Sequence, residues 1–226
     1  MQAAQTLPHV VSFPQSIPAA EIAPARPRPM RHASGSRAYL TPAELLAVLK
    51  TARAKSARDW CMVLVSYRHG LRASEVCGLK LTDVDLRAGT IALRRLKGSM
   101  HQVQPLYQHR GQPLLDETAA LRAWLRERVD DGSGILFTSQ KGGGMHRSSW
   151  YAIFRSIATS AGLPAGKRNP HVLKHSLASH LVAGNVNLAL IRQALGHRSI
   201  GSTMEYVHAN DTQAAAACSA ALMGMF

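Results

Sequence analysis

Residues 70–75 read GLRASE and are the most informative segment of this sequence. A glycine interrupts a helical pattern, Arg72 follows it, and a carboxylate stands three positions later at Glu75. We predict a short helix over residues 74–79, in which Glu75 can reach back and orient the Arg72 guanidinium toward a phosphate. A surface salt bridge at a helix start is the simpler interpretation. The segment therefore indicates a phosphate-binding arginine only in combination with other motifs of the chain.

Patterns of regular secondary structure surround this segment. Before it, Thr41 and Glu44 form a capping-box pattern with proline at the first helical position, so we predict a helix that starts there. After it, strands are predicted over residues 90–93 and 102–106 and over 135–137. Helical patterns cover residues 57–68, 114–129, 148–161, 172–182, 188–195, 202–208 and 212–222. The sequence therefore predicts a mainly α fold with a small antiparallel β-sheet, an α+β class.

The composition points to a polyanionic partner. The chain has 226 residues, 27 Lys and Arg against 13 Asp and Glu, and a formal net charge of +14. An excess of this size favours nucleic acid first and an anionic membrane surface second. Three dispersed cysteines and the lack of any long apolar run argue against a disulfide scaffold and a membrane protein, so we expect a cytoplasmic protein.

The first 36 residues differ from the rest. They contain six of the 11 prolines and end in a basic stretch. Prolines this closely spaced interrupt any regular helical or strand pattern, so we predict a flexible arm over 1–36 and an ordered domain over 37–226. The arm could follow DNA phosphates, or it could be an unstructured tail.

A second cationic segment is residues 171–176, HVLKHS. His171 and Lys174 share a helix face, which suits a phosphate. His171 and His175 also have the spacing of metal ligands, but no acidic residue follows as in HExxH and no third ligand is obvious, so no metal is predicted. A histidine packed in the core is the alternative interpretation.

Two further segments add basic and nucleophilic groups. Lys97 stands in a predicted hairpin turn, where it could enter a DNA groove, donate a proton or simply be solvated. Residues 195–199 read LGHRS, which places His197 and Arg198 after a helix-ending glycine, and Tyr206 follows. Each segment is weak evidence alone. Together they supply what transesterification by a tyrosine needs: a phenol nucleophile, cations for the phosphorane charge and a general acid for the leaving 5′ oxygen.

These residues and their order resemble the tyrosine recombinases, the phage-integrase family, from about residue 41 to about residue 211. The resemblance implies that Arg72 is the first catalytic arginine, with Glu75 as its support. It implies that Lys97 is the general acid and that His171 assists proton transfer at the nucleophile. A tyrosine recombinase catalytic-domain fold is implied as well.

The resemblance also assigns the later residues. It implies that His197 hydrogen-bonds the phosphate and that Tyr206 is the nucleophile of a 3′-phosphotyrosyl bond. Arg72, Lys97, Lys174 and Arg198 are the implied DNA contacts. Lys174 departs from the family, which has arginine there, because lysine keeps the charge but loses the bidentate fork. Activity is therefore expected to be reduced or differently tuned.

The layout is a second departure, because the usual core-binding domain before the catalytic domain is missing from this sequence. It resembles the short members, such as the invertases of fimbrial phase switches. The resemblance implies double-stranded DNA as partner, a homotetramer on paired sites, no cofactor, and an association with the nucleoid. An accessory DNA-binding protein could supply the missing half of a clamp. Residues 211–226 could dock on a neighbouring protomer or pack on their own domain.

Three functions remain open at this point. The leading one is a site-specific recombinase or integrase of a mobile element. A catalytically weak DNA-binding regulator on the same fold is the second, motivated by Lys174. A type IB topoisomerase is the third, because it shares the Arg, Lys, His and Tyr chemistry, but the chain length and the segment at 195–199 favour a recombinase.

Overall fold

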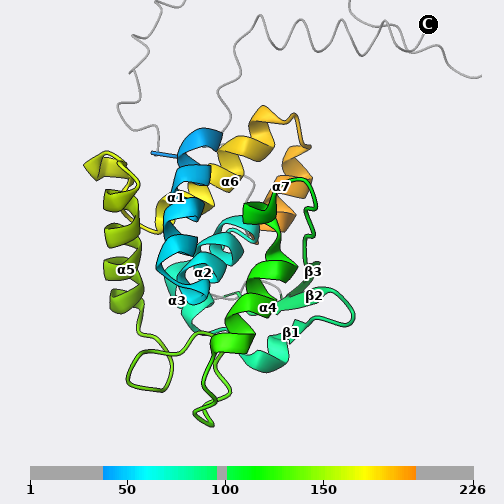
Figure 1. Ribbon diagram of the computed structural model, residues 1–226. Coiled ribbons are helices and arrows are strands. Elements are labelled where there is room, and N and C mark those ends of the chain that lie inside the picture. The colour runs from blue at the N-terminus through cyan, green and yellow to red at the C-terminus, as the bar shows by residue number, and fades with distance from the viewer. Residues whose placement is uncertain (1–37, 96–100, 197–226) are drawn as a thin grey trace, which may run out of the picture. The chain divides into compact units, whose positions relative to one another are not determined.

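The computed structural model describes residues 38–95 and 101–196 (Figure 1). The predicted arm, the turn with Lys97, and the segment with His197, Arg198 and Tyr206 lie outside these residues. So do the helices predicted over residues 202–208 and 212–222 and the segment 211–226. The helices are α1 (Pro42–Lys55), α2 (Ala57–Arg68), α3 (Ala73–Cys77), α4 (Glu117–Glu127), α5 (Arg147–Ser160), α6 (His171–Ala183) and α7 (Leu188–Leu195). The strands are β1 (Val84–Asp85), β2 (Thr90–Leu93) and β3 (Gln102–Pro105). Among these helices, none is long and apolar enough to cross a membrane.

The first helix begins where the capping box predicts. The Glu44 backbone N–H donates to Thr41 Oγ1 at 3.2 Å, and the Thr41 N–H donates to Glu44 Oε2 at 2.7 Å. Both bonds satisfy amides that a helix N-terminus would otherwise leave free. Lys167 donates two further bonds to the Glu44 carboxylate, which fixes the start of α1 against the loop before α6.

The predicted hairpin is present and extends by one strand. Within the described residues the strands form one antiparallel sheet in the order β1-β2-β3, with Ile91 opposite Gln104 in the β2–β3 ladder. The strand predicted over residues 135–137 is wrong. Ile135 makes only an isolated bridge to Lys80, because the chain passes the loop after α3 once and then turns away.

Helix α2 is the centre of the main core. It packs against α1, α4 and α6, which lie around it in Figure 1. All seven residues from Trp60 to Ser66 are buried, and six of them are apolar, as expected for a helix surrounded by others. The largest fully buried side chains include Trp150 and Phe154 of α5 and Phe137. Together these contacts fix the ends of α2, α3 and α6, where the candidate site lies.

A smaller apolar cluster joins α6 to α7. It consists of Leu177, Ala178, Ile191 and Leu195.

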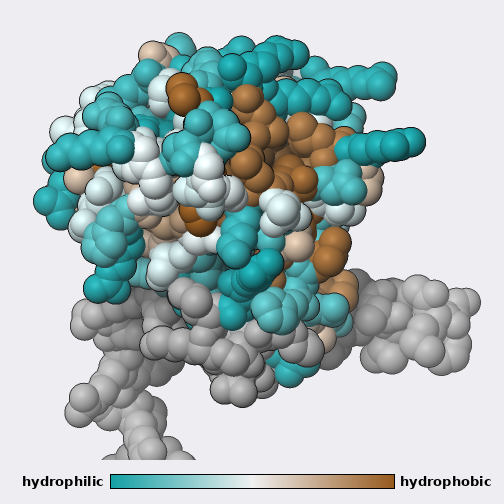
Figure 2. All heavy atoms as spheres, turned by 90° about the horizontal axis from the view of Figure 1, so that it is seen from below, coloured by the Kyte–Doolittle hydropathy of each residue, from teal (hydrophilic) through white to brown (hydrophobic). Residues whose placement is uncertain are grey.

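Hydrophilic side chains cover most of the face of the molecule in Figure 2, with an apolar region among them. The mainly helical fold with a small antiparallel sheet that the sequence predicts is therefore confirmed.

Candidate functional site

Arg72 and Glu75 form a local pair at the start of α3. Arg72 Nη1 donates to Glu75 Oε1 at 2.9 Å, and the Arg72 backbone N–H donates to Glu75 Oε2 at 2.9 Å. The Glu75 side chain is 1% exposed and that of Arg72 is 34% exposed. Helix α3 begins at Ala73, one residue before the predicted start, so Arg72 is its N-cap and its guanidinium projects from a backbone that Glu75 fixes.

Arg72 and His171 line the same pocket, which has a volume of about 400 Å³. Its wall is completed by Ala73, Ser74, Arg147, Ser148 and Tyr151, which come from the starts of α3 and α5 and from the next turn of α5. The rings of Tyr151 and His171 meet edge to face, with centroids 5.8 Å apart. Two arginines and a histidine around one open hollow form a binding site suited to a phosphate group.

Lys174 lies on the same helix as His171, but its ammonium points toward α7. The residue is 6% exposed, and Nζ donates to the Leu195 carbonyl oxygen at 3.0 Å. Burial, and then the charges of Arg72 and Arg95, lower the pKa of Lys174 to about 7, while the Glu75 carboxylate opposes the shift. Lys174 therefore belongs to the same charge cluster as the Arg72–Glu75 pair.

Arg95 is a member of this cluster that the sequence analysis did not identify. Its side chain is fully buried, and Nη1 lies 3.5 Å from Glu75 Oε2, so the carboxylate stands between two guanidinium groups. Burial lowers the pKa of Arg95, and Glu75 opposes this shift. Strand alternation gives one signal, because Arg95 continues the inward positions of Ile91 and Leu93 just beyond β2, but it does not indicate which groups Arg95 contacts.

The structure therefore brings Arg72, Glu75, His171 and Lys174 into one region. Lys97, His197, Arg198 and Tyr206 lie outside the described residues, so their positions stay predictions. Within residues 38–95 and 101–196, no group of three or more His, Cys, Asp or Glu side chains could coordinate a metal ion.

The helices, the small antiparallel sheet and the basic pocket together define a mainly α fold with one open cationic site. A model of the phage integrase family matches residues 38–213, and the chain belongs to that family, the tyrosine recombinases. "Type 1 fimbriae regulatory protein FimE" of Escherichia coli (strain K12) is 35% identical over 180 residues, which cover 77% of this chain and 87% of FimE. "Tyrosine recombinase XerA" of Pyrococcus furiosus is 33% identical over 168 residues, which cover 74% of this chain and 56% of XerA.

Solved structures agree with the family. A crystal structure of XerA recombinase has a TM-score of 0.67 and 28% identity, and the match covers 78% of this chain and 62% of XerA. XerH site-specific recombinase bound to its difH substrate has a TM-score of 0.67 and 27% identity, and the match covers 80% of this chain and 53% of XerH. The chain thus spans little more than half the length of these two proteins. The catalytic domain of bacteriophage HP1 integrase, 21% identical with a TM-score of 0.57, is covered to 94%, which shows the fold alone.

Proposed function

We propose that this chain is a site-specific recombinase that cleaves and rejoins double-stranded DNA through a 3′-phosphotyrosyl intermediate. The observation that carries the proposal is the pocket shared by Arg72 and His171, with Arg72 fixed by the buried Glu75. Two relatives support it by their names: XerA is a tyrosine recombinase, and XerH is a site-specific recombinase solved with its difH substrate.

In the proposed reaction the scissile phosphate occupies that pocket. The Tyr206 oxygen attacks phosphorus, the Tyr206–phosphorus bond forms and the bond to the 5′ oxygen breaks. His171 assists removal of the phenol proton, and Lys97 donates a proton to the leaving 5′ oxygen. Arg72 and Lys174 stabilise the negative charge of the phosphorane. A 5′-hydroxyl from another strand then reverses the step, so the phosphodiester energy is conserved and no ATP is consumed.

The proposal extends to the assembly around the DNA. Residues 37–226 would form the catalytic domain, with His197 hydrogen-bonded to the phosphate and Arg198 on the DNA. The basic arm over 1–36 would follow the DNA backbone, and residues 211–226 would dock on a neighbouring protomer. Four copies would act on two sites in the cytoplasm, on nucleoid DNA, without a cofactor. An accessory DNA-binding protein would complete the clamp.

The experiment uses a DNA site selected from a random duplex library by its binding to the full chain. A nick near the exchange point of this duplex lets the 5′-hydroxyl fragment diffuse away and traps any covalent intermediate. We expect a protein–DNA adduct that resists SDS in the wild type and none in Tyr206→Phe. An adduct in Tyr206→Phe would show that another residue is the nucleophile, and no adduct in either would reject strand cleavage.

A DNA-binding regulator with weak catalysis is the second candidate. The observation that favours it is Lys174, since its buried ammonium bonds the Leu195 carbonyl and lacks the second arm of a guanidinium. If the wild type forms no adduct but Lys174→Arg does, the regulator gains support. Relaxation of a supercoiled plasmid that lacks the selected site would instead indicate a topoisomerase.

A further inference from the structure

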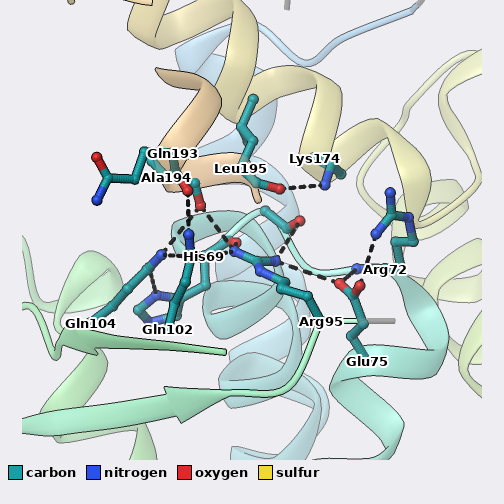
Figure 3. A network of polar contacts seen from close by, with 11 residues as sticks. His69, Arg72, Glu75, Arg95, Gln102, Gln104, Lys174, Gln193, Ala194 and Leu195 are labelled. Atoms are coloured by element: carbon teal, nitrogen blue, oxygen red, sulfur yellow. Dashed lines mark hydrogen bonds and ion pairs between the residues drawn. The ribbon is translucent and has the colours of Figure 1, made fainter. Parts of the chain in front are cut away.

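The end of α7 is bonded by side chains from elsewhere in the fold (Figure 3). Gln102 Nε2 donates to the Gln193 carbonyl, and Gln104 Nε2 donates to the Ala194 carbonyl at 3.2 Å. Arg95 Nη2 donates to the same Ala194 carbonyl at 2.9 Å, and Lys174 bonds the Leu195 carbonyl. The last carbonyls of a helix lack the usual partner in a following turn, so these donors from the hairpin and α6 bond the end of α7 in addition to the Gly196 N–H, which bonds Gln193.

The cations among these donors suit their position, because the C-terminus of a helix carries partial negative charge. The chain leaves α7 through Gly196, at φ +64°, with the Arg95 side chain against it. A Cβ at Gly196 would lie 3.0 Å from Arg95 Nε. The backbone at Gly196, where α7 ends, is therefore packed closely against the Arg95 side chain.

The same guanidinium also reaches toward Arg72. Arg95 Nη1 lies 3.4 Å from the Gly70 carbonyl and 3.5 Å from Glu75 Oε2, while Nη2 donates to the His69 carbonyl at 2.8 Å. Glu75 in turn bonds Arg72, as described above. One buried side chain thus contacts both the carboxylate that orients the pocket arginine and the last turn of α7.

A second polar path leads to the same carbonyl of Ala194. Glu117 Oε1 and His69 Nε2 are 2.6 Å apart, and His69 Nδ1 lies 2.6 Å from Gln104 Oε1. Because a carbonyl oxygen only accepts, the Gln104 nitrogen must face Ala194 and its oxygen must face His69. The amide that bonds α7 is therefore oriented from α4 through a buried histidine.

Burial of the charged Arg95 side chain costs folding free energy. A whole buried ion pair is often replaceable by apolar side chains without loss of stability, although removal of one partner alone is destabilising. Arg95 Nε is moreover one of the buried polar atoms in the described residues without a hydrogen-bond partner. Stability alone gives little reason to bury a guanidinium here, whereas the geometry it imposes on two separate elements does.

We propose that Arg95 is a positioning residue, which aligns Arg72 with the last turn of α7, the element that precedes His197 and Tyr206 in the sequence. The inference rests on the proposed function and deepens it. Arg95 would contact neither DNA nor the reacting atoms, so it would affect the rate of strand cleavage and leave DNA affinity nearly unchanged.

The test compares Arg95→Met, Arg95→Lys and a control, Arg94→Met. Arg94 is the neighbouring arginine, 58% exposed and paired only loosely with Asp83 at 3.4 Å. Single-turnover cleavage of the nicked duplex gives a rate constant and an amplitude, and a gel-shift titration gives the dissociation constant for DNA. A purely structural role would reduce the amplitude and the melting temperature but leave the rate constant of the remaining active molecules unchanged.

We expect Arg95→Met to lower the rate constant about 100-fold, the order that a misplacement of about 1 Å produces. Arg95→Lys should be intermediate, because one ammonium cannot contact Glu75 and Ala194 together. Arg94→Met should cleave like the wild type. A lower amplitude with an unchanged rate constant, or a loss confined to DNA affinity, would overturn the inference. If the wild type forms no adduct at all, the proposed function fails instead.

A second measurement does not depend on cleavage. In the DNA-free protein, hydrogen exchange of the backbone amides over residues 72–76 and 191–196 should accelerate together in Arg95→Met. Acceleration at only one of the two segments would overturn the coupling, whatever the activity. If Arg95→Met does not fold, Arg95→Lys serves in the same comparison.

Discussion

The ammonium of Lys174 lies 3.0 Å from the carbonyl oxygen of Leu195, so a side chain of α6 bonds the end of α7. Lysine at this position is a point charge with three donors, and one of them is used in this bond. Burial and two neighbouring arginines make its charged form costly. Lysine, unlike arginine, can lose its proton near neutral pH at such a site, and this difference has measurable consequences.

The first prediction concerns folding stability and pH. The pKa of Lys174 falls from 10.5 to about 7 on folding, so the unfolded chain binds more protons than the folded one between these values. The penalty for burying Lys174 is therefore fully present below about pH 7 and is relieved as pH rises toward its unfolded pKa. Lys174→Met should remove this dependence. The unfolding free energy of Lys174→Met should exceed that of the wild type at pH ~7. This difference should be smaller by about 2 kcal/mol at pH ~9, because the wild type becomes more stable as pH rises.

Urea unfolding at a series of pH values checks this prediction. Lys50→Met, at an exposed position of α1, is the control for loss of a positive charge. If the wild type and Lys174→Met curves run parallel with pH, the buried, proton-releasing state of Lys174 is wrong.

The second prediction concerns the pH dependence of cleavage under the proposed function. Arginine stays charged throughout the accessible range, whereas Lys174 loses its charge as pH rises through its pKa. Bound phosphate favours the charged form of Lys174 and therefore raises the pH at which the charge is lost. Above that pH, the ratio of the Lys174→Arg cleavage rate to the wild-type cleavage rate should grow by up to about tenfold per pH unit. Single-turnover profiles that keep a constant ratio would contradict the prediction.

The third prediction concerns Glu75. Glu75→Gln removes the negative charge between Arg72 and Arg95 and leaves two guanidinium groups without their shared partner. Removing one partner of a buried ion pair costs about 3 kcal/mol of unfolding free energy. Urea unfolding measures it, with Glu127→Gln at the exposed end of α4 as the control. Equal midpoints for the two variants would mean that Glu75 does not stabilise the cluster.

The fourth prediction concerns the glycine before Arg72. Gly70 has φ +56°, and a Cβ there would lie 2.7 Å from Leu195 Cδ2, so Gly70→Ala strains the backbone and pushes against α7. Gly89 has φ +67° with no atom within 4 Å of its would-be Cβ, so Gly89→Ala isolates the backbone effect. Gly70→Ala should be less stable than Gly89→Ala by about 1–3 kcal/mol in urea unfolding. Similar losses would show that Leu195 moves aside without cost.

Much of the local structure could be predicted because its causes lie within a few residues. The capping box at Thr41 and Glu44, the antiparallel hairpin and the contact between Arg72 and Glu75 depend on spacing along one turn or one ladder. The order of the basic segments and the tyrosine also sufficed to place the chain in its family. The strand predicted over residues 135–137 was wrong for a related reason, since a strand needs a partner that the segment itself cannot supply.

Within residues 38–95 and 101–196 the sequence by itself determined the helices, the hairpin and the pairing of Arg72 with Glu75, since each follows from residues close together in the chain. The order of the motifs along the chain determined the family. Only the tertiary structure decided that Arg95 is buried in the same cluster and that Lys174 bonds Leu195. The partners of Arg95 come from α2, α3 and α7, and no local pattern brings these elements together. Packing around α2 does so, because burial of apolar faces fixes which charged groups must share one interior space.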